Sequence, residues 1–244
     1  MTAGELALSI GSSAALRVIA RADDFTIPAG LWCYRLDRAH VVMGGALSNG
    51  GNVYAWLRDM LRLPSPEEVE IALASRGPDT HALTVLPFLA GERSPDWSLT
   101  ARAAVAGLGL DTGPLDLLRA SMEGVALRLA LIQQLLRAYF PGLRTIVGSG
   151  GALRQSPAWA QMVTDTLGSP LAITEDHETS SRGVALLALE AIGAIPAAAA
   201  VSPPATRLLT PVAERTKVYA EALARQVALA KAISAWEREI ADHP

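Results

Sequence analysis

The sequence predicts an α/β protein in which helices flank a mixed sheet. Hydrophobic residues make up 50% of the 244-residue chain and aromatic residues only 5%, which favours a helix-rich α/β protein over an all-β one. Short segments with strand character fill the beginning of the chain. From Pro114 onward, helical and strand patterns alternate, as is typical of a sheet covered by helices.

The N-terminal part is predicted to form short strands followed by helices. Apolar and β-branched segments separated by turn residues predict strands at 5–10, 15–21, 31–36 and 41–43. Apolar residues then recur at helical spacing over 53–62. The run Ser65-Pro66-Glu67-Glu68 offers a cap, a proline and two acids, which together predict a helix start.

The remaining elements follow from the same signals. A buried strand at 83–86 leads into a loop at 90–97, and 98–113 is predicted to be irregular. Beyond it, the pattern predicts helices at 114–138, 156–167, 179–192 and 211–240, and strands at 144–147 and 171–174.

The chain is predicted to hold one main domain and a C-terminal helix. Residues 197–204 are rich in Ala, Ser and Pro and resemble an exposed linker. We therefore divide the chain into a domain at 1–196, a linker at 197–209 and a helix at 210–244 that packs on the same domain.

Charge and cysteine content exclude several classes of function. The net charge is −3 with acids and bases intermixed, so no electrostatic footprint for nucleic acid is present. Cys33 is the single cysteine, which excludes an internal disulfide and indicates a reducing compartment. The apolar stretches are broken before they could span a bilayer, and no signal peptide is visible, so we expect a cytoplasmic protein without membrane contact. The four histidines are scattered, so we expect no metal site built by protein side chains.

The segment 144–159 is the most informative stretch of the chain. A β-branched strand runs into Gly148, Gly150 and Gly151, and a helix follows with Ser156 as its N-cap and Pro157 at its first position. Glycines let a ligand approach the main chain, and a helix start offers free N–H groups. The segment is neither a dinucleotide fingerprint nor a P-loop, because Leu153 replaces the third glycine and no Gly-Lys-Ser/Thr follows. An ordinary strand-to-helix turn fits equally well.

A second small-residue turn, Gly11-Ser12-Ser13, lies near the start of the chain. It fits either a β-hairpin turn or a phosphate-binding turn. Gly50-Gly51, before the helix at 53–62, fits either simple packing or close approach to a ligand. The two small-residue turns at 11–13 and 148–151 both follow predicted strands and lie far apart in sequence. Together they suggest a nucleotide cleft.

Other conspicuous side chains have structural interpretations. Glu92 and Arg93 lie among turn residues and are predicted to form an exposed ion pair that holds their loop. Trp56 and Trp159 lie among apolar helical residues and are predicted to be core or half-buried.

Five motifs follow one another over about residues 5–195. They are Leu8-Ser-Ile-Gly-Ser-Ser-Ala-Ala-Leu-Arg17, the segment from Leu31 through Asn49-Gly-Gly-Asn52 to Asp59, Leu86-Pro-Phe-Leu-Ala-Gly-Glu-Arg-Ser-Pro95, Ser121-Met-Glu-Gly-Val-Ala126, and Gly148–Trp159 with Glu178-Thr-Ser-Ser-Arg-Gly183. Together, in order and spacing, they resemble the second domain of the FGGY carbohydrate kinases, and most of all the gluconate kinase branch. One small departure is Arg102-Ala103, where members usually show Arg-Gly.

The resemblance implies a ribonuclease H-like fold, related to actin, hexokinase and Hsp70 ATPase domains, and transfer of the ATP γ-phosphate to a sugar or sugar acid with Mg²⁺. By position it places Gly11, Ser12 and Ser13 at the β- and γ-phosphates and Gly51 near the phosphates and ribose. It places Gly150 and Gly151 under the adenosine and Gln155 at its edge.

The family's general-base aspartate and most of its sugar site belong to a first domain that nothing in this chain matches. We therefore expect no catalytic residue here, and a partner domain supplied in cis or in trans. Two alternatives remain open: a non-catalytic nucleotide-binding or regulatory module, and a homodimerising structural domain.

Overall fold

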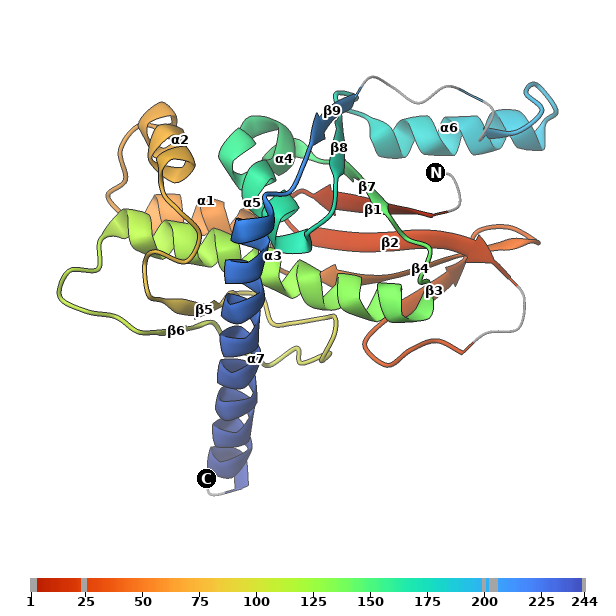
Figure 1. Ribbon diagram of the computed structural model, residues 1–244. Helices are drawn as coiled ribbons and strands as arrows, with labels where there is room; N and C mark the ends of the chain where they lie inside the picture. Colours follow the sequence, from red (N-terminus) through yellow and green to blue (C-terminus); the bar gives the residue numbers. More distant parts are fainter. Residues whose placement is uncertain (1–3, 23–25, 199–200, 202–205, 243–244) are drawn as a thin grey trace.

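The chain folds into a mixed sheet flanked by helices (Figure 1). The computed structural model describes residues 4–22, 26–198, 201 and 206–242. Within them, seven strands lie in the order β3-β4-β2-β1-β7-β8-β9, and β5 and β6 form a separate hairpin sheet. The elements are β1 (Glu5–Ile10), β2 (Ala14–Arg21), β3 (Trp32–Arg35), β4 (His40–Leu47), α1 (Gly51–Met60), α2 (Pro66–Ser75), β5 (Thr84–Leu86), β6 (Ala104–Ala106), α3 (Pro114–Tyr139), β7 (Thr145–Ser149), α4 (Gly151–Gln155), α5 (Pro157–Leu167), β8 (Leu171–Thr174), α6 (Thr179–Ala191), β9 (Thr206–Leu209) and α7 (Ala213–Asp242).

Strand β1 joins an antiparallel half of the sheet to a parallel one. It pairs antiparallel with β2, and β2 pairs in turn with β4. On its other side β1 runs parallel to β7, with Glu5 opposite Thr145 and Ser9 opposite Ser149. Parallel strands end at the same edge, so the residues that follow β1 and β7 are brought together.

The core lies between the sheet and α3. Leu6, Leu8 and Ile10 alternate along β1 and are buried on one face, as a half-buried strand requires. Helix α3 packs against α5, where the indole nitrogen of Trp159 donates to the carbonyl oxygen of Met122 at 3.1 Å. This interface supports the segment that follows β7.

Helix α7 packs on the domain from its N-terminal part as far as Ile233, which lies against the cluster of Leu86, Phe88 and Ala101. Gln226 donates to the carbonyl oxygens of Val85 and Gly124, at 2.8 and 3.0 Å, and Tyr219 is buried. The C-terminal end of α7 extends beyond the body of the domain (Figure 1), and Trp236 and Ile240 are exposed there.

Several elements differ from the prediction. Residues 104–106, predicted to be irregular, form β6, because they pair with β5. Residues 206–209, placed in the linker, form β9 on the edge of the sheet beside β8. Linker residues 199–200 and 202–205 lie outside the described residues. Trp56 is 45% exposed, because it lies on the outer side of α1, whereas Trp159 is buried as expected.

No helix in the described ranges is both long enough and apolar enough to cross a membrane.

Candidate functional site

The turn 11–13 closes the hairpin of β1 and β2. Gly11 donates its N–H to the carbonyl oxygen of Ser13 at 2.9 Å, and all three residues of the turn are exposed. The hairpin interpretation is therefore confirmed. An exposed hairpin turn still presents backbone groups and two hydroxyls to a ligand, so the two interpretations are compatible.

Gly51 begins α1 in direct contact with this turn. The Gly51 N–H donates to the carbonyl oxygen of Gly11 at 2.7 Å, and the Asn52 N–H donates to that of Ser12 at 3.2 Å. A Cβ on Gly51 would lie 2.7 Å from the Gly11 oxygen, so a side chain would force the two segments apart. Gly51 therefore allows close approach, and the first N–H groups of α1 are already used by the turn.

Gly150 and Gly151 reach the same point from β7. Gly150 has a φ of +105°, and a Cβ there would lie 2.2 Å from the carbonyl oxygen of Ile10, the last residue of β1. Glycine is required at this position both by conformation and by space. Gly151 faces open space instead: a Cβ there would meet nothing nearer than Nε2 of Gln155, at 3.9 Å.

The helix start at Ser156 is not free, which corrects the prediction. The glycines lead into the short helix α4, and Ser156 caps the next helix, α5, by accepting from the Trp159 N–H at 3.1 Å. Glu70 of α2 occupies the same helix end, because it accepts from the Ser156 hydroxyl at 2.7 Å and the Ala158 N–H at 2.6 Å. The N–H groups expected to receive a ligand at α5 are thus taken by a side chain of α2.

The structure thus brings together the turn 11–13, Gly51, Gly150 and Gly151 at the edge where β1 and β7 end. Gln155 lies beside them, exposed, one turn of α4 beyond Gly151. The glycines form an accessible surface of main chain without side chains. Such an open surface suits a flat ligand that stacks on it.

The loop between β5 and β6 contradicts the predicted Glu92–Arg93 pair. Arg93 donates to the carbonyl oxygen of Leu47 at 2.7 Å, whereas Glu92 is buried and forms an ion pair with Arg128 of α3. Arg128 also contacts Asp96 at 3.1 Å and lies 5.2 Å from the centre of the Phe88 ring. Burial raises the pKa of the Glu92 carboxyl to about 7, although the Arg128 charge acts in the opposite direction.

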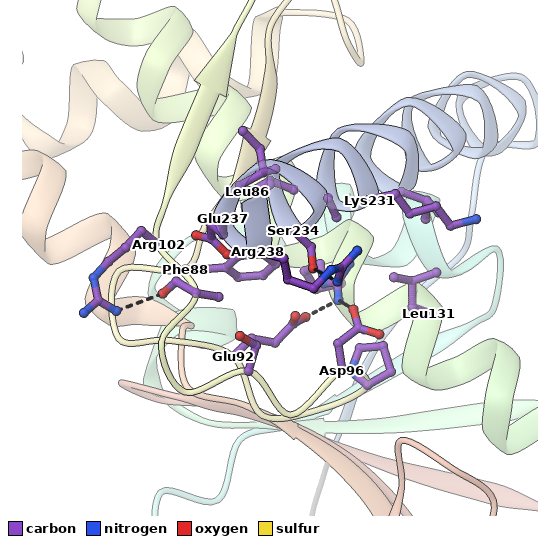
Figure 2. A pocket seen from close by; sticks show the side chains of 17 residues that line it. Leu86, Phe88, Glu92, Asp96, Arg102, Leu131, Lys231, Ser234, Glu237 and Arg238 are labelled. Carbon is purple, nitrogen blue, oxygen red and sulfur yellow. Dashed lines mark hydrogen bonds and ion pairs between the residues drawn. The ribbon is translucent and has the colours of Figure 1, made fainter. Parts of the chain in front are cut away.

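This buried pair borders a cavity of about 520 Å³ between the loop, α3 and α7. In Figure 2, Glu92 and Asp96 lie on the loop side and Ser234 and Arg238 on the α7 side. None of the glycines or serines of the predicted site lines this cavity. The cavity and the glycine surface are separate features.

A polar cluster of Asp79, His81 and Glu123 has the composition of a metal site but is occupied by side chains. The Leu83 N–H donates to Nδ1 of His81, so Nε2 carries the ring proton and donates to Glu123 at 3.0 Å. Glu123 also accepts from the Tyr219 hydroxyl at 3.1 Å and pairs with Arg119 at 2.8 Å, while Asp79 pairs with Arg225. These contacts join the segment after α2 to α3 and α7, which is a structural role.

Comparison with known proteins identifies the family. The model of the FGGY family of carbohydrate kinases, C-terminal domain, matches residues 6–192. The chain belongs to this family.

The FGGY domain is similar to known kinases over about half of the length of a gluconokinase and about a third of that of a glycerol kinase. It is 30% identical to the gluconokinase of Bacillus subtilis (strain 168), over 98% of this chain and 49% of that protein. It is 32% identical to a glycerol kinase of Ralstonia nicotianae, over 66% of this chain and 32% of that protein.

Solved structures confirm the fold class of the FGGY domain. The gluconate kinase from Lactobacillus acidophilus matches with a TM-score of 0.85 and 25% identity, over 96% of this chain and 48% of that one. The xylulose kinase from the same organism matches with a TM-score of 0.86 at 24% identity, a likeness that concerns the fold alone. The ribonuclease H-like fold expected from the sequence motifs is confirmed.

Proposed function

We propose that this domain is the ATP-binding half of a carbohydrate kinase that transfers the γ-phosphate of ATP to a hydroxyl of a sugar or sugar acid, with gluconate as the favoured substrate. The observation that carries the proposal is the convergence of the turn 11–13, Gly51, Gly150 and Gly151 at one edge of the sheet. The gluconokinase relatives support the choice of gluconate.

The proposed roles follow from the geometry of each segment. Gly11, Ser12 and Ser13 offer exposed backbone and hydroxyl groups for the β- and γ-phosphates. Gly51 lies beside them, toward the ribose. Gly151 leaves open space for the flat adenosine, with the exposed Gln155 at its edge. ATP, bound with Mg²⁺, supplies the phosphoryl group, and the residues of this domain hold and orient it.

The remainder of the site is assigned to a partner. We propose that a second domain, joined in cis or in trans, supplies the carboxylate that accepts the substrate proton and most of the sugar contacts. We also propose a cytoplasmic location, which the free thiol of Cys33 supports.

Gly151→Leu tests the adenosine seat. The substitution fills the space above α4 without striking the backbone, so the domain should stay folded while nucleotide binding is blocked. We expect wild-type thermal stability to rise by several degrees with excess MgADP, following the linkage between binding and unfolding, and the variant to show no such rise.

Gly142→Leu is the matched control. A Cβ at Gly142 also meets open space, but this residue lies before β7, at the opposite end of the strand. It should respond to MgADP as the wild type does. No stabilisation of the wild type by MgADP would contradict the proposal, and a stable homodimer with that result would favour the structural alternative.

A further inference from the structure

Asn49 occupies the turn between β4 and α1, immediately before the two glycines that meet the hairpin turn. Its side chain lies inside the protein, and the residue is only 3% exposed. A buried amide that lost its partners would cost about 1–3 kcal/mol, so its hydrogen bonds help to hold this turn. The Asn52 side chain holds the same turn from within, by accepting from the Gly50 N–H at 2.8 Å and donating to the carbonyl oxygen of Ser48 at 3.2 Å.

Both ends of the Asn49 amide bond to the main chain of the same loop. Nδ2 donates to the carbonyl oxygen of Gly91 at 2.8 Å, and Oδ1 accepts from the Ala90 N–H at 3.0 Å. One amide thus bonds to two adjacent residues of the loop. The two bonds fix where Asn49 lies along the loop and how far Asn49 lies from the loop.

The other face of the same turn touches the hairpin 11–13. A Cβ on Gly50 would lie 2.8 Å from the carbonyl oxygen of Ser13, and the Gly51 N–H donates to that of Gly11. Gly50 and Gly51 are therefore held between the hairpin on one side and the Asn49 contact on the other. A shift of residue 49 would move Gly51 relative to Gly11 and Ser12.

The loop has other anchors, farther from the glycines. Ser94 donates its N–H to the carbonyl oxygen of Ala46 at 2.9 Å and accepts from the Ala46 N–H through its hydroxyl at 3.1 Å. Arg93 bonds to Leu47, and Glu92 to Arg128. These contacts hold the loop in place without Asn49. The Asn49 hydrogen bonds therefore fix the position of the β4–α1 turn against an already anchored loop.

We propose that Asn49 is a positioning residue of the nucleotide site. By bonding residues 90 and 91 it sets the distance between Gly51 and the turn 11–13, and so shapes the seat of the phosphates. This inference rests on the proposed function, and it adds a residue to which neither the glycine motifs nor the comparisons assign a role.

The first experiment compares Asn49→Ala with Ser94→Ala by calorimetric titration with MgADP well below the melting temperature. Each variant loses a buried hydrogen-bonding side chain that joins the same loop to the β4–α1 segment, so both should lower the melting temperature. We expect Asn49→Ala to weaken MgADP binding about tenfold and Ser94→Ala to change it less than about twofold. Equal weakening by both variants, or an unchanged affinity in Asn49→Ala, would overturn the proposal.

The second experiment needs no nucleotide. Amide hydrogen exchange, followed by NMR, reports the hydrogen bonds of the Gly51 and Asn52 N–H groups to Gly11 and Ser12. We expect faster exchange at these amides in Asn49→Ala but not in Ser94→Ala. If the wild type binds no MgADP, the proposed function fails; if exchange at Gly51 and Asn52 is unchanged in Asn49→Ala, the positioning role fails.

Asn49→Asp provides a variant of nearly the same shape. Its carboxylate can accept from Ala90 but cannot donate to Gly91, whereas the protonated acid can do both. We expect its MgADP affinity, relative to wild type at the same pH, to recover as the pH falls from 8 to 5. A constant ratio across this range would count against the two-bond contact.

Discussion

Glu92 brings a carboxyl group into the interior beside the Arg128 guanidinium, and the two effects of that position oppose each other. Removal from water disfavours the charged form, and the arginine favours it. Burial is the larger effect, because the pKa of Glu92 rises from its ordinary 4.5 to about 7. The carboxyl therefore changes its charge near neutral pH, within a loop that also contacts the glycine-rich turn.

This raised pKa makes stability depend on pH. Between about pH 4.5 and 7 the unfolded chain releases the Glu92 proton while the folded protein keeps it, so the free energy of unfolding should fall as the pH rises. The expected loss is on the order of 3 kcal/mol across that range. Urea unfolding of wild type and Glu92→Gln from pH 4.5 to 8 measures it. Since all other groups are shared, the same pH dependence in both proteins would contradict the assignment.

At the scale of elements, α2 and α5 are joined by one carboxylate. Glu70 accepts two hydrogen bonds at the N-terminus of α5, where a negative charge also interacts favourably with the helix dipole. The contact fixes α5 beside α2. Helix α5 directly follows the short helix α4, which begins at Gly151.

Removing this contact should destabilise the domain moderately. We expect Glu70→Ala to lower the free energy of unfolding by about 1–2 kcal/mol, equivalent to a few degrees in melting temperature. The exposed Glu221 of α7 supplies the control, since its replacement by Ala should change stability by less than about 0.5 kcal/mol. Equal effects of the two substitutions would show that Glu70 contributes no specific cap.

Elements with strong local signals were predictable, and elements defined by a distant partner were not. The strand β1, the helix α3 and the cap and proline of α2 follow from local pattern. The strand β6 is three residues, Ala-Val-Ala, whose sequence has little strand character until β5 pairs with it.

The candidate site shows the same limit. The sequence marks the glycines as small-residue turns at strand ends, but the contacts that require glycine, such as that of Gly150 with Ile10, are set by the fold. Local sequence pairs Glu92 with its neighbour Arg93, which is wrong, because its actual partner Arg128 lies 36 positions away on α3. Local sequence likewise predicts a free α5 N-terminus, because Glu70, which occupies it, lies 86 positions before Ser156.

At the scale of the whole molecule, the domain spans about half the length of the gluconokinases that it matches. In the proposed function, its glycine surface seats the nucleotide and the general base belongs to the other half. We expect this chain alone to show no gluconate-dependent consumption of ATP, measured by ADP release.

Adding the separately produced N-terminal half of a related gluconokinase should restore gluconate phosphorylation, and that half alone is the control. Substantial gluconate-dependent turnover by the 244-residue chain alone would contradict the division of roles.

The parallel pairing of β1 with β7 also governs how the molecule is made. Glu5 of β1 pairs with Thr145 of β7, 140 positions later. The central strand β1 therefore cannot pair with β7 until residues 145–149 have been synthesised. Until then β1 is an open edge with unpaired backbone groups, which favours association between nascent chains. Production of this domain should therefore depend on chaperones that shield this edge more than its finished stability suggests.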